Sequence, residues 1–158
     1  MIPIVSNWTT KMTALGLTAV CSLCLGRSAA AGPLESEAWR RSLELAAAFS
    51  NDGFRIRDGH WIARFESGSG SKVLETNLYA GNAYWFCAAT RNPESAVTLS
   101  IHDASGAVLI SESTLDEGRS AMAFTPEISG PYYLRITLTP KPGQAPSADS
   151  FCVVYTYK

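Results

Sequence analysis

Three neighbouring residues suggest hydrolytic chemistry. Ser100, His102 and Asp103 supply a hydroxyl nucleophile, an imidazole base and a carboxylate, the groups that serine hydrolases combine. Successive side chains of a strand point to opposite faces, however, so Asp103 is not placed to orient the ring of His102. An ordinary strand histidine explains the same residues, and a small secreted hydrolase or an enzyme inhibitor stays an alternative.

Metal and cofactor patterns are weaker still. His60 and His102 are the only two histidines, and they are too far apart in the sequence to indicate a histidine-rich metal site. Carboxylates could gather around calcium at Asp116 and Glu117, or where Glu35 and Glu37 lie beside Asp149, but no EF-hand spacing is present. We therefore predict no catalytic residues, no metal and no cofactor, with calcium as a weaker alternative.

Aromatic side chains are the more promising resource for binding. Tyr133 and Arg135 are predicted to project from the strand face opposite Leu134. Together with Trp61 or Trp85 they could form an exposed platform on which a sugar or a peptide stacks. Packing of these rings in the core is the alternative, because aromatic residues also dominate sandwich interiors.

The first 31 residues have the features of a secretory signal peptide. A basic segment ending at Lys11 precedes an apolar run from Met12 to Leu25, and three alanines end at Ala31. The run is shorter than the roughly 20 residues that cross a bilayer, so we predict cleavage after Ala31 and no remaining membrane span. Translation from Met12, or lipidation at a cysteine of the run, remain alternatives.

The predicted mature chain has 158 − 31 = 127 residues, enough for one domain with its own core. Lys11 and Arg27 leave with the signal, so its formal charge becomes 11 − 14 = −3. Nucleic-acid binders carry a basic patch, so a nucleic-acid partner is not expected. The destination is predicted to be extracellular, or the periplasm or cell envelope.

Two cysteines, Cys87 and Cys152, remain after export. An oxidising compartment favours disulfides, and two cysteines allow one intramolecular pairing. We therefore predict a Cys87–Cys152 disulfide, with two buried free thiols as the alternative.

Residues 32–53 are predicted to form one amphipathic helix that packs on an end or edge of a β-sheet. Apolar side chains recur on one arc of the helix at Trp39, Leu43, Ala46 and Phe49. Charged side chains fall on the opposite arc at Glu37, Arg40, Arg41 and Glu44. A docking helix for a partner is the alternative interpretation.

Residues 54–158 show β periodicity throughout. Phe54 to Phe65 is predicted to be a hairpin, because the central Asp58-Gly59 suits a tight turn. In Pro131–Leu138, the side chains of Tyr132, Leu134, Ile136 and Leu138 share one face. About eight or nine short antiparallel strands at this spacing predict an all-β sandwich or jelly roll.

Three segments in order carry a family resemblance: Leu78-x-x-Gly81-x-x-Tyr84-x-Phe86, then Val97-x-Leu99-x-Ile101-x-Asp103-x-x-Gly106, then Phe124-Thr125-Pro126-x-x-Ser129-Gly130-x-Tyr132-Tyr133-Leu134-Arg135-Ile136. The chain resembles the bacterial pre-peptidase C-terminal domain, a secreted β-sandwich module, over residues 73–157. The resemblance implies a non-catalytic accessory module, some of whose relatives bind collagen, polysaccharide or calcium. We expect this module to be free-standing, with an N-terminal helix in place of a preceding catalytic domain.

The sequence thus predicts a secreted, non-catalytic binding or interaction module, with a polysaccharide or an extracellular protein as its ligand. A structural subunit of an envelope complex, docking through the helix around Trp39, is a further alternative.

Overall fold

The computed structural model describes residues 33–158, except residues 68, 113–115 and 144–147. The predicted signal peptide, residues 1–31, lies outside the described residues. The described chain forms a two-layer β-sandwich with one α-helix, so the predicted all-β fold class is confirmed. The elements, in order, are α1 (Pro33–Ala47), the 3-10 helix η1 (Ser50–Asp52), β1 (Arg55–Ile56), β2 (Trp61–Phe65), β3 (Gly70–Leu78), β4 (Tyr84–Thr90), β5 (Ala96–His102), β6 (Val108–Glu112), β7 (Arg119–Phe124), β8 (Gly130–Thr139) and β9 (Asp149–Tyr157).

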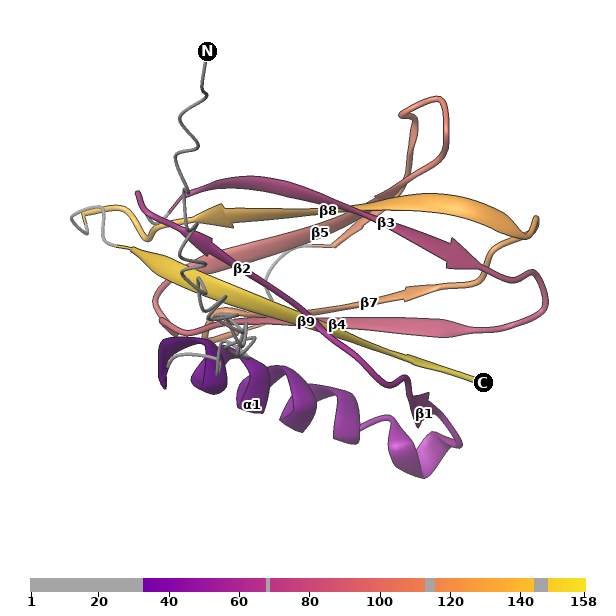
Figure 1. Ribbon diagram of the computed structural model, residues 1–158, viewed down its shortest axis with the longest axis horizontal. Coiled ribbons are helices and arrows are strands. Elements are labelled where there is room, and N and C mark those ends of the chain that lie inside the picture. The colour runs from indigo at the N-terminus through magenta and orange to yellow at the C-terminus, as the bar shows by residue number, and fades with distance from the viewer. Residues whose placement is uncertain (1–32, 68, 113–115, 144–147) are drawn as a thin grey trace, which may run out of the picture.

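The strands form two antiparallel sheets that enclose the main core. One sheet has the order β1-β9-β4-β7, with β2 also paired to β9, and α1 packs on its outer face. We call it the helix-covered sheet. The other has the order β3-β8-β5-β6, and we call it the open sheet. In Figure 1, α1 lies on the side of β4 and β9 that faces away from β3, β5 and β8.

The corner between β7 and β8 carries the chain from one sheet to the other. Pairing places β7 against β4 and β8 between β3 and β5. The hydroxyl of Tyr132 donates a hydrogen bond of 2.7 Å to the backbone oxygen of Ile128, which fastens the corner as tyrosines do in other sandwiches. The predicted core face of β8 is confirmed, because its four apolar side chains are at most 9% exposed: Tyr132, Leu134, Ile136 and Leu138.

The helix approaches its sheet through small residues. Ala38, Ser42 and Ala46 are fully buried, whereas Trp39 is 41% exposed. These three recur every four residues, so they form one stripe along the helix. The hydroxyl of Ser42 donates to the backbone oxygen of Cys152 at 2.7 Å. The close packing explains why the bulky indole of Trp39, expected on the buried arc, lies at the edge of the contact.

Arg41 is buried although the sequence placed it on the charged arc. It is 7% exposed, and its guanidinium donates to the backbone oxygens of Thr90 at 2.6 Å, Arg91 at 3.3 Å and Glu117. Arg40 faces solvent and pairs with two glutamates of its own helix. The helical period separates neighbours by about 100°, which is enough to place one arginine in the interface and the next in water.

The predicted Cys87–Cys152 disulfide is wrong in this structure. Both cysteines are free and buried beneath the helix. In the register of β4 and β9, Cys87 lies opposite Val154 and Cys152 lies opposite Ala89. The two cysteines are therefore diagonal neighbours, and a diagonal Cα separation of about 7–8 Å exceeds what a disulfide normally spans.

Replacing Arg41 with Met should lower the free energy of unfolding by about 3 kcal/mol, because three carbonyl oxygens lose a charged donor. Urea denaturation measures the loss. Arg40→Met is the matched control on the same helix and should change stability little, because its ion pairs are solvent-exposed. Equal losses in the two variants would show that the contacts of Arg41 do not hold the helix.

The buried thiols should be unreactive in the folded protein. Burial raises the pKa of Cys87 and of Cys152 from the ordinary 9.0 to about 12. Alkylation at pH 8, read by peptide mapping, should leave both unmodified, and denaturant without reductant should make both react. The folded protein holds these two thiol protons more tightly than the unfolded chain does. The contribution of the thiols to the free energy of unfolding is therefore complete below pH 9.0 and is lost as pH rises toward 12. Resistance to alkylation in denaturant would instead show a disulfide.

Candidate ligand-binding cleft

A cleft of about 730 Å³ opens between the two sheets at one edge of the sandwich. It lies between β3, the edge strand of the open sheet, and the segment that joins β1 to β2. The volume falls in the range typical of small-ligand sites. Its lining combines aromatic and polar side chains: Arg57, Asp58, Gly59, His60, Trp61, Glu75, Thr76, Asn77, Tyr79, Asn82, Tyr84, Tyr155 and Tyr157.

A bulge in the edge of the helix-covered sheet forms one wall. Ile56 pairs with Thr156 and Trp61 pairs with Val153, so five steps on one strand oppose three on β9. The two extra residues push Asp58-Gly59-His60 outward, and Gly59 takes a φ of 99°, which favours glycine. The predicted hairpin is therefore wrong: β1 and β2 both pair with β9 instead of with each other.

Aromatic rings line the interior of the cleft in a fixed arrangement. Trp61 stacks on Tyr155 with ring centroids 5.5 Å apart. The hydroxyl of Tyr84 accepts hydrogen bonds from the backbone N–H of Tyr79 at 3.0 Å and from the amide of Asn82 at 3.3 Å, which holds the β3–β4 turn in place. At the rim, the side chains of Tyr79 and Tyr157 are exposed. The cleft thus offers ring faces both inside and at its entrance.

Several polar side chains of the cleft have no partner among the described residues. Asp58 makes no side-chain hydrogen bond or ion pair within the described part of the chain, and the same is true of Glu75 and Asn77, whose side chains alternate with the buried Thr76 and Leu78 and therefore project to the outer face of β3. Arg57 places its guanidinium 5.2 Å from the ring centroid of Tyr155 and forms no ion pair with a described residue there. Arg57 and Asp58 are therefore available to a ligand in the cleft.

One buried group of the cleft lacks the partner that it normally has. Tyr155 is 4% exposed, and its hydroxyl has no hydrogen-bond partner among the described residues. Buried tyrosine hydroxyls usually find one, and leaving such a group unpaired costs about 1–3 kcal/mol. The hydroxyl therefore lies unsatisfied behind the surface of the cleft and lowers the stability of the fold.

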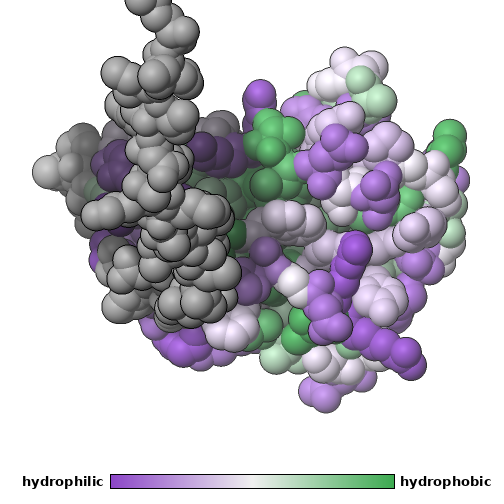
Figure 2. Space-filling model, in the orientation of Figure 1, coloured by the Kyte–Doolittle hydropathy of each residue, from purple (hydrophilic) through white to green (hydrophobic). Residues whose placement is uncertain are grey.

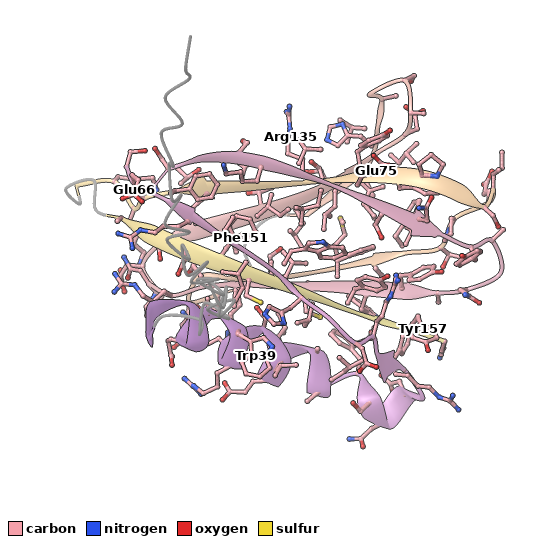
Figure 3. The ribbon with its side chains drawn as sticks, in the orientation of Figure 1. Trp39, Glu66, Glu75, Arg135, Phe151 and Tyr157 are labelled. Atoms are coloured by element: carbon pink, nitrogen blue, oxygen red, sulfur yellow. The ribbon has the colours of Figure 1, made fainter. Side chains whose placement is uncertain are left out.

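The four predicted binding residues do not form one platform. Trp61 lies in the cleft, while Trp85 lies beneath the helix and stacks on Phe49 at 4.2 Å. Tyr133 and Arg135 lie on the outer face of the open sheet, and Figure 3 shows Arg135 pointing away from the molecule on the side opposite α1. Their individual roles in binding stay predictions.

The hydrolytic residues come together on that same outer face. The hydroxyl of Ser100 lies 3.0 Å from Nε2 of His102, and Nδ1 of His102 lies 3.1 Å from the backbone oxygen of Gly106. Asp103 does not orient the ring, because its carboxylate accepts hydrogen bonds from Ser105 and Ala107 in its own turn. None of these residues lines the cleft, and a hydrolase stays an alternative prediction.

The described residues also bear on the predictions about metal binding. In the part of the chain that the structure describes, no three His, Cys, Asp or Glu side chains are grouped to hold a metal ion. Asp149, one of the suggested calcium ligands, is buried and accepts hydrogen bonds from the hydroxyl of Ser95 and the backbone of Asn92.

Among the described helices, none has the length and apolar character needed to span a bilayer. In Figure 2, hydrophilic and intermediate residues predominate outside the grey region.

Known proteins offer little guidance to this cleft. No protein-family model and no curated protein matches the chain. One solved structure, of the infectious bursal disease virus Gt strain, matches at 16% sequence identity with a TM-score of 0.34. The match covers 66% of this chain and 32% of the viral chain, and it carries no argument about function. The resemblance to the pre-peptidase C-terminal domain therefore stays a prediction.

The effect on stability of the unpaired hydroxyl of Tyr155 can be compared with that of the paired hydroxyl of Tyr132. Tyr155→Phe should leave the free energy of unfolding unchanged or raise it, because the variant removes an unsatisfied buried group. Tyr132→Phe, the control, should lower it by about 1 kcal/mol, because the hydrogen bond to Ile128 is lost. Urea denaturation compares the two. A similar loss in both variants would mean that the hydroxyl of Tyr155 is bonded in solution.

Proposed function

We propose that this chain is an exported, non-catalytic binding module that holds a glycan in the cleft. The supporting observation is the combination of stacked and exposed aromatic rings with polar side chains that have no partner among the described residues. Ligand sites generally combine an apolar, aromatic lining with a few polar groups that fix orientation. The signal peptide predicted from the sequence supports a ligand outside the cytoplasm.

The chemistry of sugars fits this lining. A sugar ring has C–H groups that pack on aromatic faces, and hydroxyls that both donate and accept hydrogen bonds. Tyr79 and Tyr157 provide exposed aromatic surface at the rim, whereas Arg57 and Asp58 provide hydrogen-bonding groups on the segment that joins β1 to β2. An extracellular protein is the alternative ligand, and a binding screen separates the two.

Binding should depend on the rim of the cleft. Screening the protein on an array of glycans and matrix proteins, followed by calorimetry, should identify a glycan ligand. Tyr79→Ala should then weaken its affinity about tenfold, as expected for an exposed aromatic anchor.

Tyr133→Ala is the matched control, because it removes a tyrosine from the outer face of the open sheet instead. Its affinity should equal that of the unmodified protein. Loss of binding in Tyr133→Ala but not in Tyr79→Ala would move the site to the outer face. Binding to matrix proteins alone would contradict a glycan ligand, and the release of shorter oligosaccharides would contradict a non-catalytic role.

A further inference from the structure

Ser100 and His102 form a hydrogen-bonded pair on the outer face of the open sheet. They are two residues apart on β5, so their side chains share one face, and both are half-buried. The hydroxyl of Ser100 lies 3.0 Å from Nε2 of His102. We propose that Ser100 is a site of covalent modification, where the hydroxyl takes an acyl group from an activated acyl donor such as an aryl ester. The pair lies outside the lining of the cleft, so this site does not depend on the proposed function.

The contacts of the imidazole ring decide which group donates in this pair. Nδ1 of His102 lies 3.1 Å from the backbone oxygen of Gly106, and a carbonyl oxygen only accepts hydrogen bonds. In the neutral ring Nδ1 therefore carries the proton, which leaves Nε2 as an acceptor. The hydroxyl of Ser100 then donates to Nε2. A hydroxyl that donates to an oriented base is the arrangement of an activated serine nucleophile.

Asp103 holds the turn that orients His102. Its carboxylate accepts hydrogen bonds from the backbone N–H groups of Ser105 at 2.8 Å and Ala107 at 3.0 Å, the two residues that flank Gly106. The backbone N–H of Gly106 also donates to the backbone oxygen of Asp103 at 3.0 Å. The carboxylate thus fixes the carbonyl group that fixes the imidazole. Asp103 is a positioning residue that acts through the turn and not on the ring itself.

The acyl transfer needs only the groups that are present. The hydroxyl oxygen of Ser100 attacks the acyl carbon while Nε2 of His102 takes the hydroxyl proton. The bond between the acyl carbon and the leaving oxygen breaks, and the leaving group departs with the electron pair of that bond. The imidazole then releases its proton to solvent. An aryl oxide leaves as a stable anion without protonation by an acid, so activated donors are the class that one imidazole can serve.

The same face contains a serine that serves as an internal reference. Ser111 of β6 is paired with Ser100 across the strands, is exposed, and makes no hydrogen bond with a histidine in the described part of the chain. On the other side of Ser100, its partner Arg135 is exposed and points away from the molecule in Figure 3. A small donor can therefore reach both serines, and only Ser100 has a base beside it.

Acetylation of the full chain tests the proposal. The protein is treated with p-nitrophenyl acetate at pH 8 and quenched in acid, and peptide mapping by mass spectrometry gives the rate at each serine. Ser100 should be acetylated about a hundredfold faster than Ser111, which is the contribution expected of a positioned general base. His102→Gln should remove this advantage and leave the rate at Ser111 unchanged.

Two variants of Asp103 test the turn. Asp103→Ala should lower the ratio of the two rates about tenfold, because the imidazole is no longer held in place. Asp103→Asn should restore most of the ratio, because its amide oxygen accepts the same backbone hydrogen bonds. Both rates are read in one molecule, so a general loosening of the fold would change both and not their ratio alone.

The outcomes that would overturn the proposal are distinct. Equal rates at Ser100 and Ser111, or an unchanged ratio in His102→Gln, would show that the hydroxyl of Ser100 is not activated. Acetylation of His102 in place of Ser100 would show that the imidazole is itself the nucleophile. None of these results would alter the glycan-binding role of the cleft, which the Tyr79→Ala variant tests separately.

Discussion

The fold depends on the need to cover β9 on both faces. Asp149 to Thr156 is buried without interruption, and both edges of the strand are paired, with β4 on one side and β1 and β2 on the other. Side chains of a strand alternate between faces, so one layer cannot cover them all. Phe151, Val153 and Tyr155 face the open sheet across the main core, and Cys152 and Val154 face the helix. The sandwich and the helix are thus two covers for one strand.

The helix stays on β9 through polar as well as apolar contacts. Its small residues bring its backbone close to the sheet. Because these side chains are small, they bury little apolar area, so apolar packing alone would hold the helix weakly. Arg41 adds hydrogen bonds to two loops that are distant in sequence, at the backbone oxygens of Arg91 and Glu117. Burial lowers the pKa of Arg41, but a guanidinium stays charged at any physiological pH, so its donors are always available. One of these loops also contains Gly118, where a Cβ would collide with the hydroxyl of Thr90. The loop and the helix therefore constrain each other.

Much of the fold could be predicted from periodicity, and little of the site could. Alternation in β8 identified its buried face, because a period of two depends only on local geometry. The burial of Arg41 depends on how the helix docks on the sheet, and the diagonal placement of Cys87 and Cys152 depends on strand register; the sequence pattern specifies neither. The Asp58-Gly59 pair suits either a tight turn or a bulge, and only the pairing of both flanking segments with β9 decides between them. Among the rings of this cleft, the sequence pattern indicated only Trp61 as a binding residue.

The same bulge explains why the sandwich has a cleft at this edge. If β1 and β2 formed one regular strand, the edge beside β3 would have no outward step, and the rings could pack against that strand. Asp58, in the bulge, makes no hydrogen bond or ion pair with a described residue, and the hydroxyl of the neighbouring Tyr155 is unsatisfied, which costs stability. This cost in stability arises in β9, which forms one wall of the cleft and is paired with neighbouring strands along both edges. A rigid wall keeps the rings in place before a ligand arrives, so less conformational entropy is lost on binding.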